Sequence, residues 1–311
     1  MKLIISSPRG FCAGVTRAIE IVEKAITMWG SPIYVKHEIV HNKYVVEQLK
    51  EKGAIFVEEL HEIPSGSRVI FSAHGVPPKT FDDAKERNLQ VTDATCPLVT
   101  KVHKESKKFT SEGFKILLVG HQNHVEVVGT KGVSPENTIV VESVEDVAKL
   151  DLNDEEDVAM LTQTTLSLND TKDISEALYD RFPSMKKSRK SDICYATTNR
   201  QQAISEICKD AELVLVVGSK NSSNSNRLKE VAQKLGVQAH LIENKEHIQE
   251  SWFHGIQTIG ISAGASTPEI LVNECIERLK ELGVTQVEEK VIVEENISFS
   301  LPVSLKDRLS E

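Results

Sequence analysis

Three of the five cysteines stand directly before a stretch whose pattern predicts a helix. They occur in the sequences Phe11-Cys12-Ala13-Gly14, Thr95-Cys96-Pro97-Leu98 and Ile193-Cys194-Tyr195-Ala196. Three thiolates suit two kinds of metal centre. As the three protein ligands of an iron–sulfur cluster, they leave one iron open to substrate. Together with a histidine, they complete the four ligands of a structural zinc site. Ordinary core cysteines are not expected at three equivalent helix starts, so we predict a metal site built from Cys12, Cys96 and Cys194.

The other two cysteines lie in different surroundings. Cys208 shares a face of a predicted helix with Ile204, and Cys275 shares one with Leu271 and Leu279. We therefore predict that both are core residues.

The turns between the predicted elements are dense in hydroxyl, amide and imidazole groups. They are Ser72-Ala73-His74-Gly75, His121-Gln122-Asn123-His124-Val125-Glu126, Thr162-Gln163-Thr164-Thr165, Ser219-Lys220-Asn221-Ser222-Ser223-Asn224 and Ser262-Ala263-Gly264-Ala265-Ser266. Helix capping alone favours Ser, Thr and Asn there, but it does not account for His41, His74 and His124. Helix N-termini beside such neutral donors form good phosphate sites, so the turns predict a ligand that carries phosphate.

Two further features of the sequence restrict the kinds of reaction and ligand that we expect. Glu126 is the one carboxylate within them, which makes it a candidate proton donor, whereas Asp93 and Asp192 each precede a cysteine and are expected to shape the turn. Neither a GxxxxGK[ST] nor a GxGxxG pattern occurs, so an ordinary nucleotide or dinucleotide fold is not indicated.

One segment matches the HExxH pattern of zinc peptidases, His37-Glu38-Ile39-Val40-His41. On a helix this pattern places two zinc ligands and a general base on one face. Here a strand-like segment at 32–35 precedes it, and His41 leads into a helix that begins near Lys43. A zinc peptidase is therefore not expected, while His41 stays a candidate donor to a ligand.

The elements that must position these residues alternate between short β-branched runs and longer amphipathic patterns. Strands are predicted at 33–35, 69–71, 116–119, 158–161, 213–217 and 258–261, and helices at 15–28, 43–52, 98–112, 170–181, 199–210, 225–235 and 268–282. Most of the strands lack polar alternation, as parallel strands covered on both faces do. The alternation of strand and helix predicts an α/β fold.

A longer period groups these elements, because each of the three cysteines is followed by a helix and two strand–turn units. We predict three pseudo-repeated α/β subdomains with small, mainly parallel sheets. The expected boundaries are an N-terminal strand with the first cysteine at 1–13, subdomains at 14–96, 97–193 and 194–282, and a closing tail at 283–311 with strands near 291–293 and 297–301. Ligands of such sheets bind at the carboxyl ends of the strands, so we expect the turns and cysteines to meet at one centre.

Composition excludes several classes of protein. The 311 residues carry 37 basic and 46 acidic side chains, for a net charge of −9. This balance argues against a nucleic-acid-binding protein, although a local basic patch stays possible. No apolar stretch approaches the length of a membrane span, and no signal peptide is expected. We expect a cytoplasmic protein without nucleic-acid or membrane partners, in a compartment that keeps thiols reduced.

The longest motifs closely resemble those of the 4-hydroxy-3-methylbut-2-enyl diphosphate reductase family, also called IspH or LytB. The sequences that carry the resemblance include Arg9-Gly10-Phe11-Cys12-Ala13-Gly14, Ser72-Ala73-His74-Gly75-Val76, Asp93-Ala94-Thr95-Cys96-Pro97-Leu98, Thr162-Gln163-Thr164-Thr165, Cys194-Tyr195-Ala196-Thr197-Thr198-Asn199-Arg200-Gln201 and Ser219-Lys220-Asn221-Ser222-Ser223-Asn224. The resemblance runs from about residue 1 to residue 300, with no departure at a motif position.

The resemblance implies the last step of the non-mevalonate (MEP) isoprenoid pathway. The family removes the allylic hydroxyl of (E)-4-hydroxy-3-methylbut-2-enyl diphosphate with two electrons and two protons, which gives isopentenyl diphosphate, dimethylallyl diphosphate and water. It also implies one 4Fe-4S cluster per chain, held by Cys12, Cys96 and Cys194 at the centre of the three subdomains. The open iron would bind the substrate hydroxyl as a Lewis acid.

The family's residue roles fall on the polar turns of this sequence. Its substrate contacts correspond to His41, His74, His124, Thr164, Ser222, Ser223, Asn224 and Ser266. Glu126 would supply protons, with Thr164 and His124 helping to relay or orient them. A low-potential donor such as a flavodoxin or ferredoxin would supply the electrons. The alternative is a metal-stabilised module that binds a phosphate ligand without redox turnover.

Overall fold

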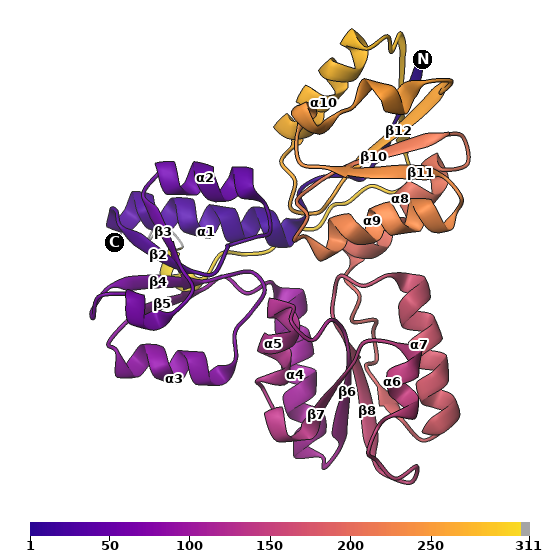
Figure 1. The fold of residues 1–311 in the computed structure, drawn as a ribbon. Helices are drawn as coiled ribbons and strands as arrows, with labels where there is room; N and C mark the ends of the chain where they lie inside the picture. The colour runs from indigo at the N-terminus through magenta and orange to yellow at the C-terminus, as the bar shows by residue number, and fades with distance from the viewer. Residues whose placement is uncertain (306–311) are drawn as a thin grey trace. The chain divides into compact units, whose positions relative to one another are not determined.

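The strands form three separate sheets, and every strand pair within them is parallel. The computed structural model describes residues 1–305 (Figure 1). Helices alternate with the strands along the chain, so the predicted α/β class with three small parallel sheets is confirmed. The chain divides into two compact units. The first comprises Met1–Val15, His41–Val45 and Tyr195–Ile297, and the second comprises Thr16–Val40, Val46–Cys194 and the chain from Ser298 on.

The first unit contains a five-stranded sheet in the order β11-β10-β12-β1-β13. Its strands are β1 (Lys2–Ser7), β10 (Leu213–Val217), β11 (Gln238–Ile242), β12 (Thr258–Ala263) and β13 (Gln286–Val291), and its helices are α8 (Tyr195–Ile207), α9 (Ser223–Lys234) and α10 (Glu269–Glu281). Alternate residues of β10 face opposite sides. Leu213 and Leu215 pack with α10 residues, and Val214 and Val216 pack with α8 and α9 residues. Figure 1 shows the sheet between these helices.

The second unit contains two four-stranded sheets. One has the order β3-β2-β4-β5 and is built from β2 (Ile33–Lys36), β3 (Ala54–Val57), β4 (Arg68–Phe71) and β5 (Gln90–Asp93). Helix α1 (Ala13–Trp29) precedes β2 in the chain, α2 (Lys43–Glu51) follows β2, and α3 (Pro78–Glu86) follows β4. Val69 and Phe71 of the central strand β4 are fully buried in its core.

The other sheet of this unit has the order β7-β6-β8-β9. It is built from β6 (Lys115–Val119), β7 (Thr138–Val141), β8 (Val158–Thr162) and β9 (Lys186–Lys187), with α4 (Pro97–Ser111), α5 (Val125–Lys131), α6 (Val144–Ala148) and α7 (Leu168–Arg181). Leu117 and Val119 of β6 pack with α7 residues, whereas Ile116 and Leu118 pack with α4 residues. Both faces of the strand are covered, which explains its uninterrupted apolar sequence.

Several helices begin with residues that favour a helix N-terminus, namely proline at the first position or serine as the N-cap. Pro97 is the first residue of α4, where its missing N–H costs nothing. Ser143, Ser167 and Ser222 are the N-cap residues of α6, α7 and α9, and each side chain accepts a backbone N–H of the first turn. Short 3-10 helices complete the chain at Leu60–Glu62, Pro135–Asn137, Lys245–His247, Glu250–Phe253 and Val303–Leu305.

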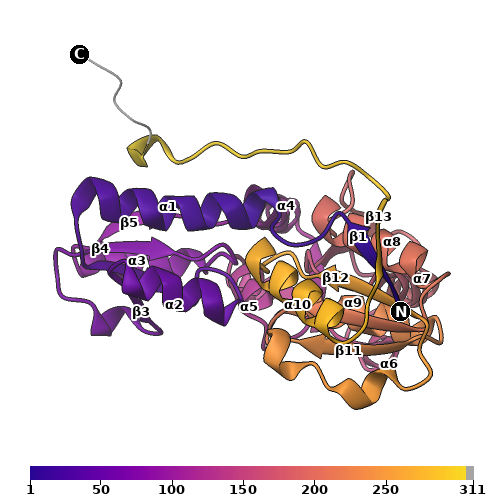
Figure 2. The same ribbon diagram turned by 90° about the horizontal axis from the view of Figure 1, so that it is seen from above.

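The end of the chain differs from the prediction. The last strand is β13 (Gln286–Val291), which pairs with β1 (Figure 2), and no strand occurs at 297–301. The pairing ends where Val291 meets Ser7, because β1 itself stops there. Residues 306–311 of the predicted closing tail lie outside the described part of the chain. Among residues 1–305, no helix combines the length and the apolar character needed to cross a membrane.

Candidate active site

Each of the three predicted metal ligands lies directly before a helix, as the sequence indicated. Cys12 precedes α1, Cys194 precedes α8, and Cys96 is the N-cap residue of α4. All three residues are partly exposed. A metal centre could therefore reach each of them from the surface.

The backbone N–H of each of these cysteines donates a hydrogen bond to a carbonyl of a polar turn. The three bonds are Cys12 to Ala265 (3.2 Å), Cys96 to Ala73 (3.0 Å) and Cys194 to Thr164 (3.1 Å). Predicted substrate contacts stand at or beside these acceptors, namely Ser266, His74 and Thr164. The fold thus attaches each cysteine to one of the turns that the sequence singled out.

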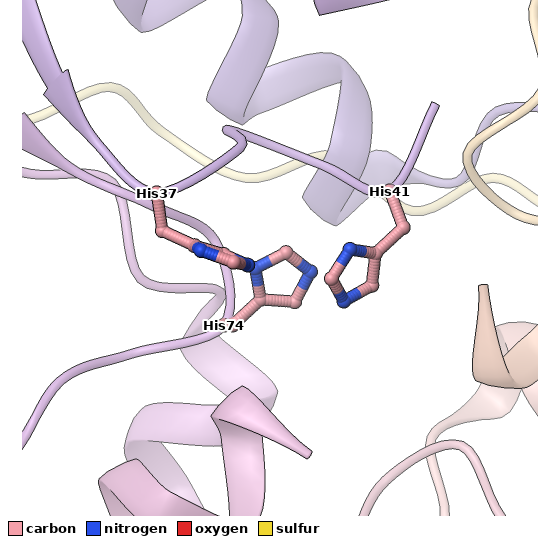
Figure 3. Close-up of side chains that lie close together, drawn as sticks. All are labelled: His37, His41 and His74. Atoms are coloured by element: carbon pink, nitrogen blue, oxygen red, sulfur yellow. The ribbon is translucent and has the colours of Figure 1, made fainter. Parts of the chain in front are cut away.

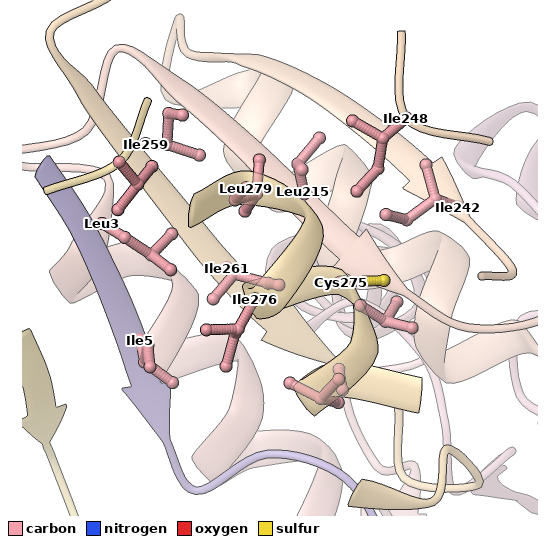
Figure 4. Close-up of a cluster of buried hydrophobic side chains, with 14 of the residues drawn as sticks. Leu3, Ile5, Leu215, Ile242, Ile248, Ile259, Ile261, Cys275, Ile276 and Leu279 are labelled. Atoms are coloured by element: carbon pink, nitrogen blue, oxygen red, sulfur yellow. The ribbon is translucent and has the colours of Figure 1, made fainter. Parts of the chain in front are cut away.

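Cys275 is a core residue, as predicted, whereas Cys208 is partly buried at the edge of the core. Cys275 is fully buried in the first unit, with its sulfur among apolar side chains (Figure 4). Cys208 packs against a second cluster that includes Ile204. Burial raises the pKa of Cys208 to about 11 and that of Cys275 to about 12, so both remain neutral thiols near pH 7 and are poor metal ligands.

Glu126 is the most unusual titratable group of the second unit. It lies in the first turn of α5 with only 4% of its surface exposed. Thr164 donates to both carboxylate oxygens, from its backbone N–H to Oε1 at 2.6 Å and from its hydroxyl to Oε2 at 3.0 Å. Burial nevertheless raises the pKa of Glu126 to about 7, because the two hydrogen bonds from Thr164 lower the pKa by less than desolvation raises it. The negative charge of Asp192 raises it further.

Two predicted histidines lie near the start of α5, where one of them contacts the backbone of Glu126. His124 is the N-cap residue of α5, and its Nδ1 accepts the backbone N–H of Glu126 at 3.2 Å. Because Nδ1 supplies a lone pair, the neutral ring carries its proton on Nε2. The ring of His74 lies 6.2 Å from that of His124, measured between centroids. Nδ1 of His74 also forms a hydrogen bond with Oγ of Ser72, at 3.2 Å.

The absence of a side chain at Gly129 allows α5 to approach the turn that follows His74. A Cβ at Gly129 would lie 3.0 Å from the carbonyl oxygen of Gly75, which is tighter than side chains normally allow. Gly75 itself has a φ of +80°, a conformation that favours glycine. Helix α5 therefore packs closely on the turn that carries His74.

The HExxH segment is not a helix, in agreement with the sequence analysis. β2 ends at Lys36, and His37 follows with a φ of +62° in an irregular loop. Its Nδ1 lies 2.8 Å from Glu58, and its ring centroid lies 6.0 Å from that of His74 (Figure 3). The arrangement of a helical zinc peptidase is thus absent from this segment.

The first unit holds five of the predicted substrate contacts, namely His41, Ser222, Ser223, Asn224 and Ser266. Ser222 is the buried N-cap residue of α9, and Ser223 is the first residue of that helix. The buried Asn224 accepts the N–H of Ala265 at 3.0 Å and donates to the hydroxyl of Thr197 at 3.3 Å. The turn at the start of α9 is therefore fixed to the turn after β12.

His41 and Ser266 also meet in the first unit. The hydroxyl of Ser266 donates to the carbonyl of His41 at 2.9 Å. The side chain of Asn221 lies 3.5 Å from Nδ1 of His41. Ser266 thus contacts His41 directly, and Asn224 is bonded to Ala265, the residue before Ser266.

Charged residues that the sequence analysis did not single out hold the segments before the cysteines. Arg200 is fully buried and donates to the carbonyl of Gly10 at 2.7 and 3.1 Å and to Glu295 at 3.0 Å. Arg17 donates to the carbonyls of Ala94 and Thr95 at 3.2 and 3.1 Å. The bonds to Gly10, Ala94 and Thr95 fix the backbone one or two residues before a cysteine. These residues carried no local signal, because their partners are remote in the sequence.

Asp93 and Asp192 shape the turns before Cys96 and Cys194, as predicted. Asp93 accepts the backbone N–H of Thr95 at 2.9 Å. Asp192 accepts from Lys101 at 2.8 Å and from the N–H of Thr162 at 3.1 Å. Both carboxylates therefore accept hydrogen bonds that hold the local structure.

The comparison with family models decides the classification, because residues 3–280 match the model described as LytB protein. The chain belongs to this family. A protein of Mannheimia succiniciproducens named 4-hydroxy-3-methylbut-2-enyl diphosphate reductase is 56% identical over 309 residues, which cover 98% of each chain. A protein of the same name from Protochlamydia amoebophila is 54% identical over 302 residues, covering 97% of this chain and 96% of its own.

Solved structures agree with this membership of the LytB family. The E-1-hydroxy-2-methyl-but-2-enyl-4-diphosphate reductase of Plasmodium falciparum matches with a TM-score of 0.95 and 39% identity, over 98% of this chain and 96% of its own. A structure described as (E)-4-hydroxy-3-methyl-but-2-enyl diphosphate reductase, the terminal enzyme of the non-mevalonate pathway, matches with a TM-score of 0.65 and 34% identity. That match covers 90% of this chain and 99% of the other. The family resemblance inferred from the motifs is thus confirmed.

Proposed function

We propose that this chain reduces 4-hydroxy-3-methylbut-2-enyl diphosphate to isopentenyl and dimethylallyl diphosphate, the last step of the non-mevalonate pathway. Support comes from the reductases named above, which share more than half of their residues with the chain over nearly its full length. The observation that carries the proposal is the set of three partly exposed cysteines, each directly before a helix and each hydrogen-bonded through its backbone to a polar turn.

The donor set fits an iron–sulfur cofactor. Cys12, Cys96 and Cys194 would hold one 4Fe-4S cluster per chain, since three thiolates leave one iron without a protein ligand. When bound, the cluster would supply that iron as a Lewis acid and would deliver electrons one at a time. Cys208 and Cys275 take no part in this site because burial keeps them protonated.

The protein's own residues would bind the diphosphate through neutral donors. The hydroxyls of Ser222, Ser223 and Ser266, the amide of Asn224 and the ring of His41 supply hydrogen bonds beside the N-terminus of α9. The dipole of a helix N-terminus also favours a bound anion. The ring of His74 would be a further donor. This mode of binding needs no lysine cluster, in keeping with the acidic composition.

Glu126 would supply the proton that accompanies the leaving hydroxyl. The substrate takes up two electrons and two protons, its allylic carbon–oxygen bond breaks, and the oxygen leaves as water. A pKa of about 7 keeps a substantial fraction of Glu126 protonated near neutral pH. Thr164 would orient the carboxyl group, and His124, which accepts the N–H of Glu126, would help to relay the proton.

The electrons must come from a partner, because neither these side chains nor the substrate can supply them. A low-potential carrier such as a flavodoxin or ferredoxin would meet this need. The proposal also locates the enzyme in the cytoplasm, where cysteine ligands stay reduced before the cluster is assembled.

The test is anaerobic reconstitution with iron and sulfide, followed by turnover with dithionite-reduced methyl viologen. We expect acid-labile sulfide and iron in the protein and release of water and the two diphosphate products. Replacing Cys12, Cys96 or Cys194 by Ser should sharply reduce cluster content and turnover, whereas the matched variants C208S and C275S should retain both. Loss of the cluster in a folded C208S variant would contradict the ligand assignment. Tight substrate binding without any turnover would instead favour a phosphate-binding module.

A further inference from the structure

A basic segment stands out in this acidic chain, directly before Cys194. Four of the five residues from Lys186 to Lys190 are Lys or Arg, and all four side chains are exposed. The run begins in β9, the edge strand of the β7-β6-β8-β9 sheet. A net charge of −9 for the whole protein makes such a concentration of positive charge exceptional.

Two of these basic side chains form no ion pair within residues 1–305. Lys186 lies 3.5 Å from Glu112 and over the ring of Phe114. Arg189 and Lys190, by contrast, have no carboxylate within ion-pair distance in the part of the chain that the structure describes, residues 1–305. Charges held at a surface without a partner are available to a partner molecule.

The backbone that displays Arg189 and Lys190 is fixed. Lys101 of α4 donates to the carbonyls of Lys190 and Ser191 at 2.8 and 3.1 Å. The hydroxyl of Ser188 donates to Asp192 at 2.9 Å and also contacts Glu105 of α4. Because several contacts hold the segment against α4, the two free charges are presented at a defined place.

Neighbouring residues extend this charge into a basic face. Lys172, Lys187, Arg189 and Lys190 line one surface depression of about 440 Å³, with the hydroxyls of Thr171, Ser175 and Ser191 between them. We call the four basic side chains the basic face. The depression is lined by the N-terminal half of α7 and by the segment from Lys187 to Ile193. Its exposed basic side chains suit contact with another protein surface.

The basic face lies close along the chain to two of the proposed cluster ligands. Arg189 is five residues from Cys194, a span of at most about 18 Å even for a fully extended chain. Lys101, which fixes the segment, belongs to the first turns of α4, the helix that Cys96 caps. A partner bound on this face would therefore approach the segments that carry Cys96 and Cys194.

We propose that the basic face docks the electron donor, an acidic one-electron carrier protein of the flavodoxin or ferredoxin class. This inference rests on the proposed function, because the reduction consumes two electrons per substrate. In each encounter the carrier is oxidised by one electron and the enzyme is reduced by one, so the carrier must bind and leave twice per turnover. Exposed charge pairs favour such fast, reversible encounters by raising the association rate. Small, weak interfaces are typical of redox partners.

The charge pattern favours a protein partner over nucleic acid. Four basic side chains match an acidic patch on a small carrier. A nucleic-acid-binding domain normally has a net positive charge and a longer basic stripe, whereas this chain has a net charge of −9.

The test compares the double variant R189E/K190E with a matched double variant, K79E/K85E, which reverses two exposed lysines of α3. Binding of oxidised flavodoxin and oxidised ferredoxin to the reconstituted protein is measured by calorimetry at 50 and 200 mM salt. We expect R189E/K190E to weaken binding of the carrier roughly tenfold or more at low salt. It should also reduce the salt dependence of binding, while K79E/K85E should change neither.

A second readout separates this inference from the proposed function. With methyl viologen as reductant, R189E/K190E should turn over like the unaltered protein, whereas with a carrier protein its KM for the carrier should rise about tenfold. Absence of turnover with methyl viologen in the unaltered protein would refute the proposed function. Normal turnover together with unchanged carrier affinity in R189E/K190E would overturn the docking face, as would binding of a single-stranded oligonucleotide that competes with the carrier at this site.

Discussion

Thr164 holds both oxygens of the Glu126 carboxylate and also accepts the backbone N–H of Cys194. One residue, in the turn directly after β8, therefore connects the buried carboxyl group of α5 to the backbone of Cys194. This connection explains why the carboxyl group has a defined orientation although its surroundings favour its neutral form. The protonation of Glu126 can be tested in two independent ways, by turnover and by the pH dependence of stability.

The first prediction concerns turnover. Glu126→Gln keeps the size and hydrogen bonding of the side chain but cannot donate the carboxyl proton. We expect turnover with methyl viologen to fall by at least about 10²-fold, the usual contribution of one positioned general acid. Cluster content and the spectral change on adding substrate should be retained. Turnover close to that of the unaltered protein would mean that another group supplies the proton.

The second prediction concerns stability and pH. The pKa of Glu126 is about 7 in the folded protein, against 4.5 for an ordinary glutamate. The folded state therefore binds the proton more tightly than the unfolded state does. The resulting stabilisation is complete below about pH 4.5 and is lost as the pH rises through 7, by about 3 kcal/mol in all. Urea unfolding between pH 5 and 8 should show this loss in the unaltered protein and not in E126Q. Equal pH slopes in the two proteins would contradict the raised pKa.

The sequence predicted the parts of the fold that depend on local pattern. Uninterrupted β-branched runs such as 213–217 and 116–119 became central strands, because both of their faces are covered by helices. The helix starts after the three cysteines were also predictable, since Pro97 and the polar turns mark them locally.

Elements stabilised by remote contacts were not predictable in this way. β3 and β5 are four-residue strands with exposed residues, and their sequences acquire a strand conformation only beside β2 and β4. β13 is almost entirely exposed and highly charged, so no apolar pattern marks it. It forms because β1 offers a free edge at the other end of the chain.

The same distinction holds for the candidate site. Glu126 and the three cysteines were identified because their residue types are chemically distinctive in their turns. Arg200 was not, because its role depends on Gly10 and Glu295, which lie 190 and 95 residues away. An arginine within a helix has no sequence feature that predicts full burial.

The third prediction concerns substrate binding. Ser222→Ala combined with Asn224→Ala removes two neutral hydrogen-bonding groups at the start of α9. Each lost bond weakens binding by roughly 0.5–1.5 kcal/mol, so KM for the diphosphate substrate should rise about five- to a hundredfold with the cluster intact. Loss of the Ser222 cap alone costs about 1 kcal/mol of stability. The control is therefore Ser143→Ala, which removes the N-cap of α6. If the double variant binds substrate normally, the phosphate groups do not lie here.

The fourth prediction concerns Arg200, which positions the segment that carries Cys12. Its guanidinium group is fully buried, donates to the carbonyl of Gly10 and forms an ion pair with Glu295 at 3.0 Å. Removing one member of a buried pair leaves an uncompensated charge or unpaired carbonyls, so Arg200→Met should lower the free energy of unfolding by about 3–5 kcal/mol.

Arg200→Lys tests positioning more directly, because it keeps the charge but cannot reach the carbonyl of Gly10 and both oxygens of Glu295 with one planar group. We expect this variant to fold and to retain Glu126 with its raised pKa, since that carboxyl group belongs to the other unit. Its cluster, however, should be lost faster on exposure to air than that of the unaltered protein, as followed by visible absorbance. The exposed pair Arg278–Glu250 supplies the control, because Arg278→Lys changes the same chemical group far along the chain. Equal rates of cluster loss in Arg200→Lys and Arg278→Lys would show that the buried arginine contributes to stability alone.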